Sequence, residues 1–251
     1  ACFVEAEEAV AGYWPAVQGR SLLLVRRGDY DNAITLLEAA VQENAKRVSL
    51  LRLLGNTLVK AGRPDQGVEI LERVVSLAPI SESHLDLARA LTASGHQQIA
   101  GAEFQRAVVK GPESVGAHFA FATWLVEAGQ IDSAAEHFDA VTQLGHPHLG
   151  RFGKGLIQIE RKEYKLALGS FQHVLQLRPQ MSIVKYHAAV AHEKLGNPEP
   201  ARALYEAYIA EAAALGEGDE TLKSAREKLA LLVQNHFSKP QRPSVPLTGV
   251  P

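Results

Sequence analysis

The chain of 251 residues contains a single cysteine, Cys2, so it can form neither an intramolecular disulfide nor a cluster of thiolates around zinc. Its 26 Lys and Arg nearly balance its 28 Asp and Glu, and no strongly basic field is available to hold nucleic acid by charge alone. No apolar run reaches the roughly 20 residues that a membrane helix needs. These absences argue against a disulfide scaffold, a zinc finger, a nucleic-acid-binding protein and a membrane-spanning protein.

The most informative feature that is present is a periodic set of turn-forming positions. They recur at steps of 34, 33, 34, 33 and 34, at Gly28, Gly62, Gly95, Gly129, Lys162 and Gly196. Small residues stand seven positions before each turn, at Ser21, Gly55, Ala88, Ala122, Gly155 and Ala189, and five positions after it, at Ala33, Gly67, Ala100, Ala134, Ala167 and Ala201. Only a hydrogen or a methyl group fits where two helices cross closely, so the pattern predicts two antiparallel helices around each turn.

Large apolar residues follow each turn at a fixed distance and predict the core between repeats. They stand nine positions after the turn, at Leu37, Leu71, Phe104, Phe138, Phe171 and Tyr205, and a second apolar set follows at Ala40, Val74, Ala107, Val141, Val174 and Ile209. Spacings of three and four positions place both sets on one helical stripe. Proline removes a backbone donor and restricts the residue before it, so we expect four second helices to end at Pro79, Pro112, Pro147 and Pro179.

This pattern resembles the tetratricopeptide repeat (TPR), a helix-turn-helix of about 34 residues. Six repeats can be drawn between residues 14 and 215. The resemblance implies an all-α, right-handed α-solenoid. The sequence departs from the family pattern at Gly67, at Lys162 and, in the first helix of repeat five, at Arg151 and Lys154, where apolar residues are usual. We therefore expect repeat five to pack more loosely than the others.

The two ends of the chain differ from the repeats. Residues 1–13 fit the register of a second helix, so we expect either a half-repeat left from a longer array or a cap on repeat one. Leu222, Ala225, Leu229, Leu232 and Val233 predict a C-terminal capping helix within residues 216–236. Residues 237–251 hold four prolines and no acidic residue, which predicts an extended tail that lies either on a partner or on this chain's own solenoid.

Chemical motifs are scarce. No two of the ten histidines are three or four positions apart, the spacing that would place two imidazoles on one helical face for a shared metal ion. The glycines between Gly145 and Gly155 follow no predicted strand and lack a phosphate-loop lysine, and no hydrolase, dinucleotide or zinc-protease motif occurs. We expect Trp14 and Trp124 to pack in the core. The sequence therefore predicts no enzyme, no cofactor and no metal site.

The first helix of each repeat is expected to face the concave side of the solenoid, and its inner positions supply the candidate binding residues. The N-terminal half of this face is predicted to be polar and basic, and the C-terminal half apolar and aromatic. The candidates for contact with a partner are Arg52, Asn56, Lys60, Arg89, Phe119, Thr123, Phe152, Leu156 and Tyr186. Exposed apolar area beside fixed charge suits a groove for a peptide, whereas burial of Phe119 and Phe152 by neighbouring helices is the alternative.

Part of this face resembles the carboxylate clamp of chaperone-binding TPR domains, in which Arg52, Asn56 and Lys60 would belong to the clamp. Asp86 stands where the next repeat should offer an asparagine, and a carboxylate there would repel the carboxylate of a client. Gly116 and Ala120 replace two further basic residues. The resemblance to this subgroup is therefore incomplete and argues against a chaperone co-factor.

The sequence predicts a non-catalytic scaffold or adaptor that binds another protein or peptide in its concave groove, as a subunit of a larger assembly. Two alternatives are a TPR recognition domain of a longer enzyme, which the half-repeat at residues 1–13 favours, and a self-assembling coat. Ala1 and Cys2 resemble the end of a bacterial lipoprotein signal, which favours a bacterial envelope protein, although Cys2 could equally be a small packing residue. The sequence identifies neither the partner nor the oligomeric state.

Overall fold

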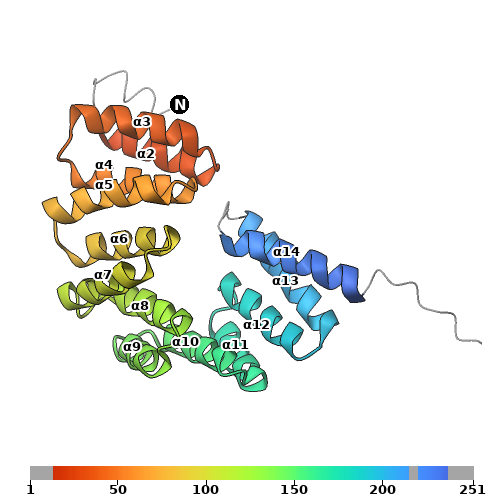
Figure 1. Cartoon of the computed structure of the whole chain (residues 1–251). Coiled ribbons are helices and arrows are strands. Elements are labelled where there is room, and N and C mark those ends of the chain that lie inside the picture. The colour runs from red at the N-terminus through yellow and green to blue at the C-terminus, as the bar shows by residue number, and fades with distance from the viewer. Residues whose placement is uncertain (1–13, 215–219, 237–251) are drawn as a thin grey trace, which may run out of the picture.

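The computed structural model describes residues 14–214 and 220–236, which form thirteen α-helices and contain no strand (Figure 1). The expectations for residues 1–13, including Cys2, and for residues 237–251 lie outside this range. In chain order the helices are α2 (Trp14–Arg26), α3 (Tyr30–Glu43), α4 (Val48–Lys60), α5 (Pro64–Leu77), α6 (Ser81–Ala93), α7 (Gln97–Lys110), α8 (Val115–Glu127), α9 (Ile131–Gln143), α10 (Pro147–Glu160), α11 (Tyr164–Leu177), α12 (Ser182–Lys194), α13 (Pro198–Ala214) and α14 (Glu220–His236).

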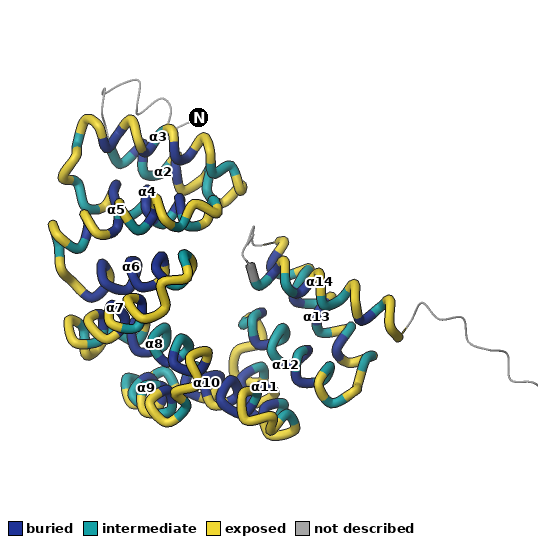
Figure 2. Tube along the Cα trace, viewed as in Figure 1, coloured by how far each residue is buried: buried dark blue, intermediate teal, exposed yellow. Residues whose placement is uncertain are grey.

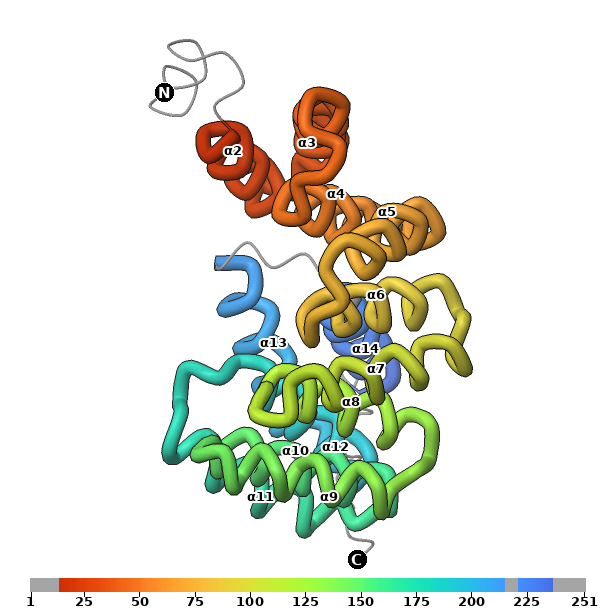
Figure 3. Tube along the Cα trace, turned by 90° about the vertical axis from the view of Figure 1, so that its left-hand side faces the viewer, coloured from red at the N-terminus to blue at the C-terminus, as the bar shows by residue number. Residues whose placement is uncertain are grey.

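The helices stack in two layers that curl into a solenoid, which confirms the predicted all-α architecture. Each helix packs on its neighbours in sequence, and the even-numbered helices from α2 to α12 also contact one another across the repeats. These first helices therefore form the inner layer, and the odd-numbered helices form the outer layer. The solenoid curls until α14 stands opposite α6 across the concave side (Figures 1 and 3). None of the described helices is long and apolar enough to cross a membrane.

The turns within the hairpins have the conformation that the period predicts. The five turn glycines have φ between 74° and 83°, in the left-handed region that glycine enters without strain. Lys162 occupies the same position in the fifth hairpin with φ of 62°, and it is the one non-glycine residue with positive φ among the described residues. The repeat therefore imposes its turn geometry even where the favoured residue is missing, at a local cost of about 1 kcal/mol.

The predicted small residues are buried where the two helices of each hairpin cross. A Cβ on Gly55 would lie 2.6 Å from Cγ of Leu71, and one on Gly155 would lie 2.3 Å from Cε1 of Phe171. A Cβ at either position would therefore displace the side chain of Leu71 or Phe171, whereas the equivalent positions of the other repeats hold alanine or serine. The large apolar set is equally buried, with at most 3% of each residue exposed at Leu37, Leu71, Phe104, Phe138, Phe171 and Tyr205.

Two details of the fifth repeat correct the sequence analysis. Pro147 does not end α9, which stops at Gln143; it is the first residue of α10, where its missing N–H is not needed. Repeat five is also not loosely packed, since α10 carries glycines at its contacts with both neighbouring helices, and a Cβ on Gly153 would lie 2.1 Å from the ring of Phe138. Arg151 and Lys154 are simply exposed.

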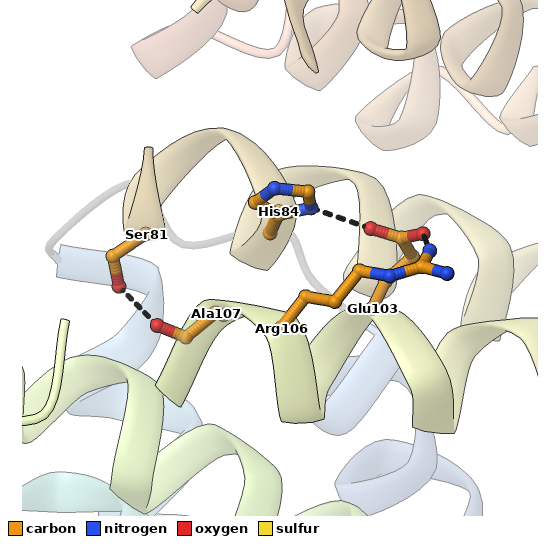
Figure 4. Close-up of polar contacts among 5 residues, drawn as sticks. All are labelled: Ser81, His84, Glu103, Arg106 and Ala107. Carbon is orange, nitrogen blue, oxygen red and sulfur yellow. Dashed lines mark hydrogen bonds and ion pairs between the residues drawn. The ribbon is translucent and has the colours of Figure 1, made fainter. Parts of the chain in front are cut away.

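Polar pairs replace apolar contacts between α6 and α7. Nδ1 of His84 lies 2.6 Å from Oε2 of Glu103, whose other carboxylate oxygen accepts a hydrogen bond from Arg106 (Figure 4). The side chains of His84 and Glu103 are each only 7% exposed. Ser81 donates a hydrogen bond of 2.8 Å to the carbonyl of Ala107 nearby. Ser81, His84 and Glu103 are tolerated in the interior because each finds a partner, whereas Oγ of Ser83, also buried on α6, has none among the described residues.

The two tryptophans are half-buried rather than enclosed in the core. The ring of Trp14 packs under the guanidinium of Arg47, 4.2 Å from the ring centroid. Trp124 packs against Phe104 and donates a hydrogen bond of 2.9 Å from Nε1 to Oε1 of Gln97. Both side chains therefore lie at the boundary between the core and the surface.

Candidate functional site

The inner layer is not uniform along the solenoid, and its C-terminal half carries a row of aromatic rings. Phe119 of α8 stacks on Phe152 of α10, with ring centroids 6.1 Å apart and planes within 15°. Tyr186 of α12 continues the row through His187, which packs edge-on against Phe152. The period of the sequence places these side chains at one height on successive inner helices, so they form a continuous apolar wall.

A cavity of about 530 Å³ opens on this wall between α8, α10, α12 and α14. Its residues are Phe119, Thr123, Val126, Glu127, Phe152, Leu156, Ile159, Glu160, Ile183, Tyr186, His187, Thr221 and Ser224. The first turns of α14 close one side, where the hydroxyl oxygens of Tyr186 and Ser224 lie 3.0 Å apart. The capping helix is therefore a wall of the cavity as well as a cover for the last repeat.

A second cavity of about 300 Å³ continues from the first toward α6. Phe119, Thr123 and Glu127 line both cavities, and Arg89, Thr92 and Trp124 line only the smaller one. We call the two cavities together the concave groove. Figure 2 shows that α6 is buried along most of its length, whereas buried and exposed residues alternate along the outer helices α7, α9 and α11.

Six of the nine predicted contact residues line the concave groove: Arg89, Phe119, Thr123, Phe152, Leu156 and Tyr186. Their accessibility differs. Phe119, Thr123 and Tyr186 are partly exposed, whereas Phe152 is 3% and Leu156 is 8% exposed. Phe152 and Leu156 therefore belong to the core and offer only an edge to the groove, as the alternative interpretation held for Phe152.

The remaining three residues, Arg52, Asn56 and Lys60, line neither cavity. Nε of Arg52 lies 2.8 Å from Oδ2 of Asp86, a carboxylate that is 9% exposed. The charge of Arg52 is thus compensated within the wall. The ion pair between Arg52 and Asp86 was not predicted from the sequence, and contact of Arg52 with a partner stays a prediction.

The sequence analysis missed Glu127, Glu160, His187, Thr221 and Ser224 as groove residues. Glu127 and Glu160 are the last residues of α8 and α10, and each stands two positions before a turn, as Lys60 does in α4. Extending the inner face by one position along each helix would have found them. Thr221 and Ser224 could not be found in this way, because α13 has 17 residues, against 13 or 14 in the other outer helices, and α14 therefore begins outside the register of the period.

His187 lies in the apolar floor of the groove, among the rings of Phe152, Phe171 and Tyr186. Burial lowers the pKa of this imidazole to about 4, so it is neutral at physiological pH. It makes no hydrogen bond to another described residue. Partial burial also raises the pKa of Glu127, because it removes part of the water that would solvate the carboxylate.

Two further histidines pair between α8 and α9. Nδ1 atoms of His118 and His137 lie 3.0 Å apart, and Nε2 of His118 lies 3.0 Å from the carbonyl oxygen of Pro112. Burial, and then the neighbouring His118, lower the pKa of His137. The two histidines belong to different helices, so a search for histidines on one helix could not detect the pair. Among the described residues no group of three or more metal-binding side chains comes together.

Comparisons with known proteins agree with the repeat architecture. Tetratricopeptide repeat models match residues 24–90, 119–182 and 184–213. A search of curated proteins gives no match. Among solved structures, a tetratricopeptide repeat protein from Parabacteroides merdae is similar at 18% identity and a TM-score of 0.62, over 89% of this chain and 94% of that one.

Two longer proteins share the fold over part of their length. Cut9, in the APC/C hetero-tetramer Cut9–Hcn1, is 11% identical with a TM-score of 0.67, over 91% of this chain and 45% of that one. Yeast Tom70 is 16% identical with a TM-score of 0.60, over 88% of this chain and 48% of that one. At these identities the likeness shows the fold alone. The repeated turn geometry, the buried crossings and the three matching sequence models together show that this chain belongs to the tetratricopeptide repeat family.

Proposed function

We propose that this protein is a non-catalytic scaffold that binds a segment of a partner polypeptide in its concave groove. The observation that carries the proposal is the pair of adjoining cavities on α8, α10 and α12, which share Phe119, Thr123 and Glu127. Partly exposed aromatic and aliphatic side chains supply area whose removal from water favours binding. Polar groups at the rim supply hydrogen bonds.

The shape of the groove favours a polypeptide over a small molecule. The two cavities adjoin along successive inner helices and remain open to solvent, which suits an elongated guest. Three elements, α8, α10 and α12, repeat similar contacts at one height. A segment of chain can place successive side chains against such a repeated surface.

A role in an assembly is consistent with one structural relative. Cut9 occurs in a hetero-tetramer with a second protein, Hcn1. We propose that this chain also contacts a second protein, and that the contact is made by the concave groove. The residues that carry the contact in our proposal are Phe119, Thr123 and Tyr186, because they are partly exposed and line the larger cavity.

The experiment is selection of peptides from a random dodecapeptide library displayed on phage, with the full chain as target. We expect enriched peptides that share a large apolar residue. A Thr123→Arg variant should enrich these peptides about tenfold less than the wild type, because the long side chain fills the junction of both cavities. Phe152→Glu is unsuitable as a test, because it would bury a charge in the core.

The matched control is Thr35→Arg on α3. Thr35 is exposed and lines neither cavity, and its hydroxyl donates to the carbonyl of Asp31 just as that of Thr123 donates to the carbonyl of Phe119. Both substitutions therefore remove an equivalent hydrogen bond and add one positive charge. Selection that yields no common peptide, or equal loss in both variants, would contradict the proposal.

A further inference from the structure

We propose that the concave groove selects a polypeptide segment that carries a lysine or arginine next to a large apolar side chain, with Glu127 and Glu160 binding the cation. This inference rests on the proposed function and adds the chemistry of the guest. It concerns the larger cavity, whose charged side chains are these two glutamates.

Both carboxylates lack an ion-pair partner among the described residues. Glu127 and Glu160 are exposed at the rim of the cavity, and neither forms an ion pair with another described residue. The contrast is Asp86, which Arg52 compensates in the N-terminal half of the same wall. A guest with a positive charge would therefore find two uncompensated acceptors beside the apolar floor.

A further argument is the place of the two glutamates on their helices. Each is the last residue of its helix, α8 or α10, where the helix dipole presents its negative end. A carboxylate there opposes the dipole, whereas α2 and α4 end on the favourable cations Arg26 and Lys60. Two helix ends and two carboxylates thus direct negative potential to one rim of the groove, and a guest cation would compensate all four.

The apolar floor of the larger cavity lies beside the two carboxylates and favours their contact with a cation. Partial burial raises the pKa of Glu127, so a neighbouring cation would favour its ionised form. The floor below is built from Phe119, Tyr186 and the edge of Phe152, so an aliphatic or aromatic side chain fits there. His187 in the same floor has no hydrogen-bond partner among the described residues and can bond to a polar group of the guest.

The position of Arg89 gives the guest a direction. Arg89 lines the smaller cavity, toward α6, and is the one cation among the described residues that line either cavity. It would repel a lysine or arginine placed at that end. The cation of the guest is therefore directed into the larger cavity, which Glu127 and Glu160 both line and Arg89 does not, and the uncharged or acidic part of the segment toward α6.

The test repeats the library selection with the wild type and with the double variant Glu127→Gln, Glu160→Gln. We expect wild-type binders to show Lys or Arg within three positions of the apolar anchor at least about threefold more often than the unselected library. The double variant should still enrich the apolar anchor but lose the preference for Lys and Arg. The variant is expected to fold, because it removes charges that oppose two helix dipoles.

The matched control is Glu38→Gln with Glu69→Gln on α3 and α5. These residues are exposed and line neither cavity, and the control changes the net charge by the same amount. A synthetic peptide from the wild-type selection, and its counterpart with glutamate in place of the basic residue, would then be compared by fluorescence anisotropy. We expect the basic peptide to bind about tenfold more tightly to the wild type and to the control, and less than about threefold more tightly to the double variant.

The possible outcomes separate this inference from the proposed function. Enrichment of apolar peptides without basic residues would overturn the inference and leave the scaffold function standing. A preference for basic peptides that persists in the double variant, or that the control removes as well, would also overturn it, since the preference would then come from overall charge. Failure to enrich any common peptide would contradict the proposed function itself.

Discussion

The two halves of the inner wall are built from the same repeat, but they differ in whether their charged side chains form ion pairs. In the N-terminal half, Arg52 of α4 is neutralised by Asp86 of α6. In the C-terminal half, Glu127 and Glu160 form no ion pair with another described residue, and they stand beside a row of partly exposed rings. In our proposal, binding capacity follows from groups that the fold leaves without an ion-pair partner, and not from the number of charges on a surface.

The interior shows a related contrast at equivalent positions. His84 and Glu103 in the third repeat correspond, one repeat later, to His118 and His137 in the fourth. The first pair joins an imidazole to a carboxylate that Arg106 also contacts, and the second joins two imidazoles. One position between the two helices of a repeat therefore accepts either a charge-assisted contact or a hydrogen bond between uncharged groups.

We expect the largest loss of stability from a substitution that breaks the pair of His84 and Glu103 in the third repeat. Glu103→Leu removes the acceptor of both His84 and Arg106 and should lower the free energy of unfolding by about 3 kcal/mol. His137→Leu at the equivalent position of repeat four should cost only about 1 kcal/mol, because it removes a hydrogen bond between uncharged groups. Urea unfolding followed by circular dichroism measures both values. Equal losses would contradict the contrast between the two pairs.

A somewhat smaller effect concerns His187 in the floor of the groove. Its pKa of about 4 in the folded protein lies below the usual value of 6.5, so the unfolded chain binds the proton more readily between these values. Stability is therefore fully present above pH 6.5 and is lost as the pH falls toward 4. Between pH 7.5 and pH 5 the loss from this group should be about 2 kcal/mol.

The variant His187→Asn isolates this contribution. It keeps a polar side chain in the floor but removes the titrating group. Between pH 7.5 and pH 5, the free energy of unfolding of the variant should therefore decrease by about 2 kcal/mol less than that of the wild type. Acidic residues elsewhere act on both proteins alike and cancel in the difference. Parallel pH profiles would mean that the imidazole is solvated in the folded protein.

The smallest expected effect concerns the ion pair of the N-terminal half. Because the pair is partly exposed, a double-mutant cycle of Arg52→Gln and Asp86→Asn should give a coupling energy of about 1 kcal/mol. Asp86→Asn alone should also leave the charge of Arg52 uncompensated. In the library selection this variant should enrich acidic peptides that the wild type does not bind. A coupling energy near zero would show that the pairing does not hold the cation in place.

Much of the fold could be predicted because the period repeats local requirements. The turn needs a residue that enters the left-handed region, and the crossing needs a residue without a large side chain, so Gly28 and Gly55 are informative by themselves. Lys162 shows that the register of the array determines the turn even when one residue departs from it. Pro147 misleads because proline is common both after a helix and at its first position.

The candidate site was only partly predictable, because it depends on contacts between repeats. Phe119 and Thr123 follow from the inner register, but the compensation of Arg52 by Asp86 requires knowing that equivalent positions of successive repeats lie side by side. Burial of Phe152 depends on how closely α10 approaches its neighbours. The part of the groove made by Thr221 and Ser224 lies outside the register of the period, because α13 is longer than the other outer helices.

Hydrogen–deuterium exchange of the full chain, with and without a saturating concentration of a peptide from the library selection, tests the central claim most directly. We predict slower exchange in α6, α8, α10 and α12 and in the first turns of α14, with little change in α3, α5 and α9, which line neither cavity. Protection confined to the outer helices, or to α2 and α4, would contradict the assignment of the concave groove as the binding surface.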